Sequence, residues 1–365
     1  MKAPTASPAL LGPAAERRLR PLSFFEFWPG WLFYAPVVAH WILLGLRYRD
    51  LSLPTAANPA ITTGGLCGES KTAILDLVGP AAQDLIAPYA GVVTRPDGLA
   101  DVERAMAQAA MRFPIVLKPD IGCNGTGVRL ALGPGDVVNY LAAFPPGERL
   151  VVQKYVDTPH EAGLFYIRDP GESVGRITSV TMKTQPVVVG DGRSSLRDLI
   201  LADERAGRVP HLYFGTLADR LHEVPPQGAR VSLVFVGNHC KGSIFRDAPD
   251  LATPALTLAI ERLARAMPDF HFGRIDVRFS SVPELRRGLG FKVIEINGVG
   301  SEATHIWDPR TRLLEAWRAQ FYHYGRAFRI GAANRRRGFR SASLRRMYRD
   351  WRNQRRLMAS YPPND

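Results

Sequence analysis

A lysine followed closely by a run of glycines is the first pattern in this sequence that could do chemistry. Lys118 ends the short apolar run 115–118, which indicates a β-strand. The stretch after it contains Gly122, Asn124, Gly125, Thr126 and Gly127. Glycines let a backbone approach a ligand closely, and successive N–H groups in such a loop form an anion-binding nest. The pattern therefore predicts a loop that grips phosphate groups, with Lys118 as an added positive charge.

The residues after this loop exclude two common phosphate-binding motifs. A P-loop and a dinucleotide fingerprint both run from a strand through the loop into a helix. Here the loop is followed by 128–132, a second short strand, and no Gly-Lys-Ser/Thr triplet is present. We therefore expect a hairpin that covers phosphates. The alternative is an ordinary hairpin whose turn requires glycine.

An acidic cluster lies much later in the chain. Glu295 and Asn297 are two residues apart in a strand-like segment, so they share one face, with Ile294 and Ile296 on the core side. Asp276 lies in another alternating segment and can reach them if the two segments pair. Two carboxylates and an amide oxygen are ligands that suit Mg²⁺, with Mn²⁺ as an alternative ion, shared with phosphates. The alternative is a solvated, charged strand face. Together, the loop and the acidic cluster predict ATP chemistry.

These motifs resemble those of the ATP-grasp superfamily, which includes D-alanine–D-alanine ligase, glutathione synthetase and biotin carboxylase. The resemblance covers residues 100–325. It implies an α+β (α/β) fold in which two α+β subdomains clasp ATP, preceded by an N-terminal segment. Irregular alternation of strand-like and helical segments also favours α+β over a doubly wound sheet.

The resemblance further implies roles for individual residues. Lys118 and Lys183 would contact phosphates, and segment 153–156 is similar to the hinge that clasps adenine, although it begins with Gln153 where glutamate is common. Glu161 matches the acid that holds the ribose hydroxyls. The nucleotide-binding residues expected on this basis are Lys118, Gly122, Asn124, Gly125, Thr126, Gly127, Gln153, Lys154, Val156, Glu161 and Lys183. The expected metal ligands are Asp276, Glu295 and Asn297, and the expected catalytic residues are Arg274, Lys118 and Lys183.

Two further segments are candidates for contact with a second substrate. A glycine-rich loop at 62–71 runs into the helical segment 72–78, which could place Ser70 and Lys71 at a helix N-terminus, a natural anion site. Glu69 is a neighbouring candidate, and the alternative is a plain capped turn. The segment after the second acidic strand adds Ser301, Glu302 and His305, where the resembling ligases carry an acceptor-binding loop.

Composition indicates a globular protein with an anionic partner. The chain has 365 residues, 46% of them hydrophobic, which suits two or three subdomains with a substantial core. Three scattered cysteines argue against a disulfide framework and for a reducing, cytoplasmic compartment. The net charge is +13, and between residues 326 and 356 Asp350 is the only acid among many arginines. Such a tail suggests membrane lipid or an acidic substrate, and we favour these over nucleic acid.

The N-terminal region contains the most apolar and aromatic stretch of the chain, residues 24–46. Its uninterrupted part, from Trp31 to Leu46, is about 16 residues long, short of the ~20 needed to span a bilayer. Arg47 and Arg49 follow directly, which fits an interfacial helix at the inner face of a membrane. The alternatives are a buried helix, a dimer contact or a spanning helix.

The sequence therefore predicts an ATP-dependent carboxylate–amine (or carboxylate–thiol) ligase that forms an acyl phosphate and releases ADP and phosphate. Its substrates would be small-molecule or lipid-like. The alternatives are a kinase of the same superfamily that phosphorylates a hydroxyl, and a membrane- or nucleic-acid-associated binding protein with a non-catalytic ATP fold. The expected organisation is a disordered start (1–22), an aromatic and substrate-binding segment (23–95), the ATP-grasp domain (96–330) and a basic tail (331–365).

Overall fold

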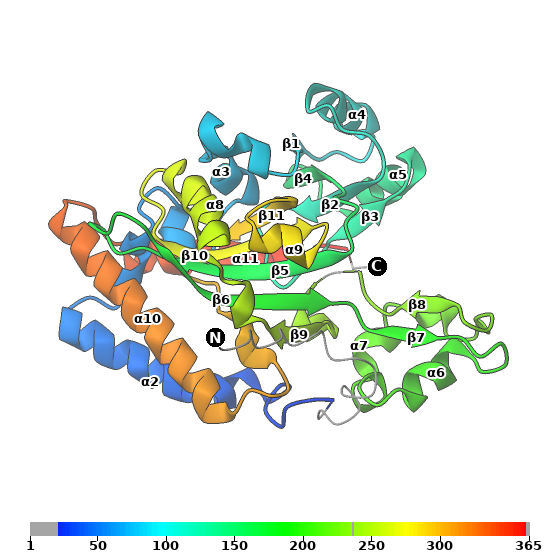
Figure 1. The fold of residues 1–365 in the computed structure, drawn as a ribbon. Helices are drawn as coiled ribbons and strands as arrows, with labels where there is room; N and C mark the ends of the chain where they lie inside the picture. Colours follow the sequence, from blue (N-terminus) through cyan, green and yellow to red (C-terminus); the bar gives the residue numbers. More distant parts are fainter. Residues whose placement is uncertain (1–20, 236, 363–365) are drawn as a thin grey trace, which may run out of the picture.

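The computed structural model describes residues 21–235 and 237–362. Within them the chain forms three β-sheets, the larger two covered by helices (Figure 1). The strands are β1 (Tyr89–Val93), β2 (Ile115–Pro119), β3 (Arg129–Ala131), β4 (Arg149–Lys154), β5 (His160–Ile167), β6 (Arg176–Thr184), β7 (Val187–Val189), β8 (Arg230–Ser232), β9 (Ile244–Asp247), β10 (Phe272–Phe279) and β11 (Phe291–Asn297). The helices are α2 (Gly30–Tyr48), α3 (Lys71–Asp76), α4 (Leu99–Gln108), α5 (Pro134–Ala143), α6 (Leu196–Ala202), α7 (His211–Phe214), α8 (Pro254–Arg265), α9 (Val282–Arg286), α10 (Leu313–Arg336) and α11 (Leu344–Met358). The predicted α+β class is confirmed.

The four-stranded sheet carries the glycine-rich loop. Its strands are antiparallel in the order β1-β4-β2-β3, and β2 pairs with β3 across the loop, so the predicted hairpin is confirmed. The helices α4 and α5 pack on this sheet because each has an apolar face, with Val102 and Met106 on α4 and Val137 and Tyr140 on α5. The loop therefore projects from a packed two-layer unit.

The five-stranded sheet forms the centre of the molecule. Its strands are antiparallel in the order β11-β10-β5-β6-β9. Helices α3 and α8 cover one face, where Leu164 and Ile260 share a core, and α10 covers the other, where Phe165 and Ile330 pack together (Figure 1). Because both faces are covered, β5 is buried from Ala162 onward and reads as a continuous apolar run.

A β-bulge in β11 changes which of its side chains face the core. Asp276 pairs with Glu295 and Val277 pairs with Val293, so Ile294 has no partner on β10. One extra residue shifts the alternation of side chains by one. Val293 therefore packs in the core while Ile294 is only half-buried. The prediction that Ile294 lies on the core side is wrong for this reason.

The aromatic N-terminal stretch forms α2, which lies parallel to α10 (Figure 1). Near one end, the indole N–H of Trp317 donates to the carbonyl of Phe33 (3.0 Å), and near the other Arg335 donates to the carbonyl of Tyr48 (3.3 Å). Between them, Trp41 packs edge-on against aromatic rings of α10. One side of α2 is thus buried on α10. Among the described residues, none of the helices has the length and apolar character needed to cross a membrane.

A small third unit packs beside the chain start. Strands β7 and β8 pair, and α6 and α7 contribute Leu196 and Tyr213 to a core against which Leu22 packs. The predicted disordered segment 1–22 lies outside the described residues except for Pro21 and Leu22. The carbonyl of Pro21 accepts a hydrogen bond from Arg205 (2.6 Å).

The described part of the basic C-terminal region is mostly helical. It contains the end of α10 and the whole of α11, which is capped by Ser343. The side chain of Gln354 accepts a hydrogen bond from the backbone of Gly68 (2.7 Å), and the hydroxyl of Tyr361 donates to the carbonyl of Ile121 (2.8 Å). The C-terminal residues therefore hold both glycine-rich loops.

Asn58 ties the N-terminal segment to the central sheet, and its side chain is fully buried. Its amide group donates to the carbonyls of Phe272 (2.7 Å) and Gly64 (3.1 Å) and accepts from the backbone N–H groups of His271 (3.0 Å) and Phe272 (3.1 Å). One buried side chain thus makes hydrogen bonds to four backbone groups from two separate segments.

We expect Asn58→Ala to lower the free energy of unfolding by about 3 kcal/mol, because it leaves several buried backbone groups without partners. Urea denaturation followed by circular dichroism measures the change. Asn139→Ala, at an exposed position of α5, is the matched control and should stay within about 0.5 kcal/mol of the wild type. Equal stability of the two variants would contradict this role of Asn58.

Candidate functional site

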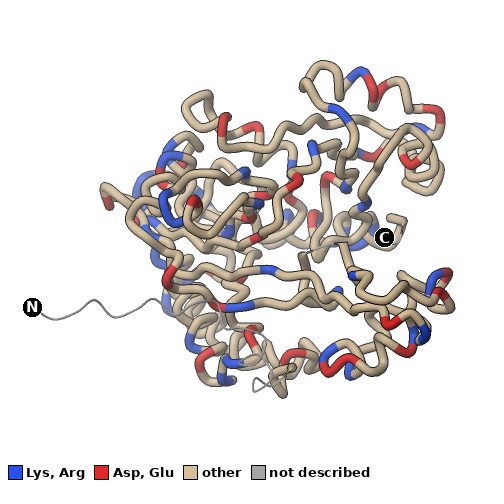
Figure 2. The backbone as a smooth tube through the Cα atoms, turned by 45° about the vertical axis from the view of Figure 1, so that its right-hand side comes forward, with Lys and Arg blue, Asp and Glu red and all other residues tan. Residues whose placement is uncertain are grey.

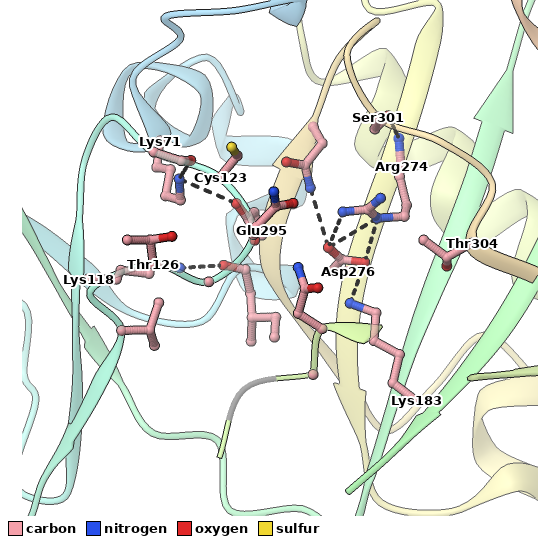
Figure 3. Close-up of a pocket in the computed structure, with 18 of the residues that line it drawn as sticks. Lys71, Lys118, Cys123, Thr126, Lys183, Arg274, Asp276, Glu295, Ser301 and Thr304 are labelled. Atoms are coloured by element: carbon pink, nitrogen blue, oxygen red, sulfur yellow. Dashed lines mark hydrogen bonds and ion pairs between the residues drawn. The ribbon is translucent and has the colours of Figure 1, made fainter. Parts of the chain in front are cut away.

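A cavity of about 590 Å³ lies between the two larger sheets (Figure 3). Residues of β2 and β4 line one side, and residues of β5, β6, β10 and β11 line the other. Residues of the segments 66–71, 122–126 and 300–304 line the remaining sides. The cavity therefore collects side chains from both glycine-rich loops and from the acidic strands.

Lys118 connects the two sheets across this cavity. Its ammonium group donates to the side-chain oxygen of Gln153 (2.9 Å) on the first sheet and to the carbonyl of Ile294 (3.0 Å) on the second. That carbonyl belongs to the bulged residue of β11. Burial lowers the pKa of Lys118 to about 8, although Glu295 and other nearby carboxylates act in the opposite direction.

Asp276 is the centre of a buried charge network. Arg274 (3.0 Å) and Lys183 (3.0 Å) both pair with its carboxylate, and Lys183 also pairs with Glu161 (3.1 Å). Figure 3 shows Arg274 and Lys183 approaching Asp276 from two sides. Burial by itself would raise the pKa of Asp276, but the two cations outweigh burial and hold the pKa at about 2. The aspartate is therefore ionised at any physiological pH.

Glycine at position 163 makes room for this network. Gly163 of β5 lies directly opposite Asp276 of β10. A Cβ atom at position 163 would lie 3.0 Å from a carboxylate oxygen of Asp276 and 3.1 Å from the side chain of Arg274. Both distances are tighter than ordinary van der Waals contact, so a larger residue would displace the charged groups.

The three predicted metal ligands come together as expected. Asp276 and Glu295 pair across neighbouring strands, and the amide of Asn297 donates to Asp276 (3.3 Å). Among the described residues, no three His, Cys, Asp or Glu side chains gather as a metal cluster, and this set has only two carboxylates plus one amide. Its oxygen atoms nevertheless fit Mg²⁺, which is usually held by one or two carboxylates together with phosphate oxygens.

Lys71 joins the acidic strands to the glycine-rich loop. Its ammonium group lies 3.5 Å from the carboxylate of Glu295 and donates to the carbonyl of Gly122 (2.6 Å). Within the loop, Asn124 and Gly125 have positive φ angles of 56° and 67°, which turn the chain sharply over the cavity. The loop is therefore held from both sides of the cavity.

A fixed carboxylate marks the far end of the cavity. Glu302 accepts hydrogen bonds from the hydroxyl of Tyr34 (2.9 Å), the indole of Trp307 (2.8 Å) and the amide of Gln320 (2.6 Å). The guanidinium of Arg274 also donates to the backbone carbonyl of Glu302 (3.2 Å). These contacts fix the orientation of the carboxylate and link it to the Asp276 network.

The structure places most of the sequence-predicted site residues in the cavity wall. Those that line it are Lys118, Gly122, Asn124, Gly125, Thr126, Gln153, Lys154, Val156, Glu161, Lys183, Arg274, Asp276, Glu295, Asn297, Glu69, Lys71, Ser301 and Glu302. Ser301 also accepts a hydrogen bond from the backbone of Arg274 (3.2 Å) through its hydroxyl.

Three predicted contact residues do not line the cavity. The hydroxyl of Ser70 accepts a hydrogen bond from the backbone of Ala73 (3.0 Å), so it caps α3. His305 hydrogen-bonds Ser179 (2.8 Å) on β6. Gly127 ends the glycine-rich loop, and its carbonyl accepts a hydrogen bond from the hydroxyl of Tyr140 (2.7 Å). We therefore assign these three residues to local structure.

Sequence reasoning missed several residues that line the cavity: Tyr34, His239, Cys240, Tyr324 and Gln354. His239 stacks on Trp307 (4.4 Å between ring centres), and burial lowers its pKa to about 4, so it is neutral near pH 7. These residues come from four separate segments of the chain, and no motif surrounds them. Only the folded chain brings them to one place.

Comparison with known proteins finds no matching family model and no matching curated protein. Solved structures do match. The chain is similar to a bifunctional glutathione synthetase from Pasteurella multocida, with 18% identity and a TM-score of 0.35 over 69% of this chain and 36% of that chain. It is also similar to a D-cycloserine synthetase, with 16% identity and a TM-score of 0.38 over 71% of this chain and 70% of that chain.

A third similar structure is the D-alanine–D-alanine ligase from Bacillus anthracis, with 13% identity and a TM-score of 0.38 over 76% of this chain and 70% of that chain. The chain spans only 36% of the length of the glutathione synthetase. The function proposed below rests on the geometry of the cavity.

We expect Lys118 to titrate near pH 8, well below the ordinary lysine value of 10.5. Because its pKa is lowered, the ammonium is charged below this pH and neutral above it, so the cavity loses one positive charge as the pH rises through 8. Side-chain NMR of isotope-labelled lysines measures the titration, and Lys118→Arg should remove the shifted resonance alone. A spectrum in which every lysine titrates near its ordinary value would contradict the burial argument.

Proposed function

We propose that the cavity binds Mg-ATP and that the protein uses it to join a carboxylate to an amine. One observation carries this proposal: Lys183 and Arg274 pair with Asp276, and Lys118 lines the same cavity, so three cations and the carboxylates of two neighbouring strands lie around one space. Cationic side chains bind phosphate groups, and carboxylates bind Mg²⁺. A magnesium–triphosphate complex requires both in one place.

The wall formed by the first sheet suits an adenine base. Its lining is largely apolar there and includes Val116, Val128, Tyr155 and Val156, and Ile294 of β11 faces the cavity from the other sheet. The amide nitrogen of Gln153 is buried in this wall and has no hydrogen-bond partner among the described residues. A flat heteroaromatic ring with an acceptor nitrogen would supply that partner. Glu161, which also lines the cavity, would then be available to the ribose hydroxyls.

The charged wall suits the phosphates and the metal. Lys118 and Lys183 would contact phosphate oxygens beneath the 122–127 loop, and Asp276, Glu295 and Asn297 would hold Mg²⁺. When bound, Mg²⁺ would supply charge stabilisation for the transferring phosphoryl group. The protein's own contribution is to present these groups in a fixed, largely water-excluded arrangement.

The reaction would proceed in two steps. A carboxylate oxygen of the first substrate attacks the γ-phosphorus, and the bond from phosphorus to the bridging oxygen breaks, which gives an acyl phosphate and ADP. The amine nitrogen of the second substrate then attacks the acyl carbon, loses a proton and expels inorganic phosphate. Lys118, Lys183 and Arg274 would stabilise the negative charge that develops in both steps. No nucleophile from the protein is required.

The end of the cavity near Glu302 suits the amine. The carboxylate of Glu302 is held in place by three donors, so it presents fixed negative charge to a cationic substrate group. Glu69 also lines the cavity, and one of its carboxylate oxygens is buried without a partner among the described residues. Burial raises the pKa of Glu69, which suits it to take up the proton that the amine releases.

We expect Glu295→Gln to reduce product formation by roughly a hundredfold or more, because glutamine keeps the shape of the side chain but removes the charge that holds the metal. The wild type and the variant are each incubated with Mg-ATP and an extract of polar metabolites and lipids, and products are found by differential mass spectrometry with an assay for ADP. Glu103→Gln, at an exposed position of α4, is the matched control and should retain full activity.

The mass of the product decides between the candidate reactions. A mass equal to two metabolites minus water identifies a ligase, whereas the gain of one phosphate identifies a kinase and refutes the ligase assignment. Bound ATP with no product would favour a non-catalytic nucleotide site. If Glu295→Gln were as active as Glu103→Gln, the metal assignment would fail.

A further inference from the structure

The side of α2 that faces away from α10 carries a continuous apolar stripe. Exposed residues occur at positions 31, 32, 35, 38, 39, 42, 43 and 46, the spacing of one helical face. The large side chains of this stripe are Trp31, Leu32, Val38, Ile42, Leu43 and Leu46, with exposed fractions from 39% to 76%. No charged residue occurs between Trp31 and Leu46.

The stripe is not needed to hold α2 in place. The opposite side of the helix makes the packing contacts, with Phe33 and Val37 buried and Trp41 against α10. Water contact with a contiguous apolar face is unfavourable, and monomeric soluble proteins seldom expose large patches of this kind. The stripe therefore requires a partner other than the described residues of this chain.

The C-terminal end of the stripe lies beside a corner of the molecule that is rich in exposed arginines. They come from the segment after the stripe, from the last turn of α10 and from the segment between α10 and α11: Arg47, Arg49, Arg335, Arg336 and Arg340. The carboxylate of Asp50 lies among them, but it already accepts hydrogen bonds from the hydroxyls of Ser52 (2.8 Å) and Ser341 (2.7 Å) and pairs with Arg335 (3.8 Å). Positive charge is therefore in excess at this corner.

The surface beside the stripe is also basic. On α10, which lies alongside α2, Arg318 and Arg329 are exposed, with Tyr322 between them. In Figure 2, Lys and Arg predominate along the left side of the backbone. This positive charge favours some of the partners that could cover an apolar face over others. The chain's net charge of +13 opposes self-association and favours an anionic surface.

We propose that α2 docks the protein on an anionic lipid bilayer, with the helix lying in the plane of the interface. The apolar stripe enters the headgroup and acyl boundary, Trp31 lies at the interface, and the arginine corner contacts anionic headgroups. The helix lies on the membrane rather than through it, because its inner side is part of the protein core.

Docking would also orient the cavity. Tyr34 leaves the inner side of α2 and donates its hydroxyl to Glu302 at the end of the cavity (2.9 Å). One helix therefore carries both the membrane contact and a cavity-lining residue, only three positions from Trp31 in sequence. The Glu302 end of the cavity is thus held beside the bilayer surface.

The test is co-sedimentation of the full-length protein with lipid vesicles at physiological salt. We expect binding to phosphatidylcholine vesicles that contain roughly a third phosphatidylglycerol, and much weaker binding to pure phosphatidylcholine. Leu43→Glu should weaken binding roughly tenfold or more, because it places a charge in the middle of the stripe. Leu258→Glu is the matched control, since Leu258 of α8 is 60% exposed and Leu43 is 65% exposed, and it should bind like the wild type.

The charge component is tested separately. Arg47→Gln should weaken binding to the anionic vesicles roughly fivefold and leave binding to pure phosphatidylcholine unchanged. Because Leu43 and Arg47 are exposed, both variants should melt at the wild-type temperature, which circular dichroism verifies.

Three outcomes would overturn the proposal. The wild type could fail to bind anionic vesicles, or Leu43→Glu could bind as well as Leu258→Glu, which would assign binding to the arginines alone. Alternatively, analytical ultracentrifugation without lipid could show a dimer that Leu43→Glu converts to monomer. The stripe would then be an interface between two copies of this chain.

Discussion

The buried carboxylate of Asp276 imposes the main constraint on the structure around it. A charge inside a five-stranded sheet is tolerated only when it is paired and hydrogen-bonded. Arg274 supplies one counter-charge from the same strand, and Lys183 supplies the other from β6, across β5. Gly163 on β5 leaves the space that the side chains of Asp276 and Arg274 need. The arrangement that makes this charge tolerable is also the one that would receive a triphosphate and its metal.

Lys118 connects the two larger sheets through hydrogen bonds to both. It comes from the first sheet and donates to the carbonyl of Ile294 on the second, which the β-bulge leaves without a strand partner. Burial of an ammonium group is unfavourable, as its lowered pKa indicates. Phosphate oxygens in the cavity would relieve that cost. The packing of the two sheets depends on Lys118, and phosphate binding as proposed would depend on the same side chain.

Segment 68–71 and the C-terminal segment 354–361 meet at the glycine-rich loop. Lys71, from the N-terminal segment, donates to the carbonyl of Gly122, and Tyr361, beyond α11, donates to the carbonyl of Ile121. Gly68 and Gln354 then join these two segments directly. The loop that would cover the phosphates is therefore positioned by residues that are remote from it in sequence. In a similar way, Tyr34 of α2 links Glu302 in the cavity wall to a helix on the outer surface of the protein.

The sequence by itself determined the local parts of the site. The glycine-rich hairpin and the pairing of Asp276 with Glu295 follow from strand alternation and turn residues, which are properties of near neighbours. The tertiary structure decided the rest. It brought Tyr34 into contact with Glu302, and a β-bulge turned Ile294 toward the cavity. It also left Ser70 and His305 outside the cavity wall. Contacts between remote elements depend on how whole layers pack, and no local pattern of residue types records that packing.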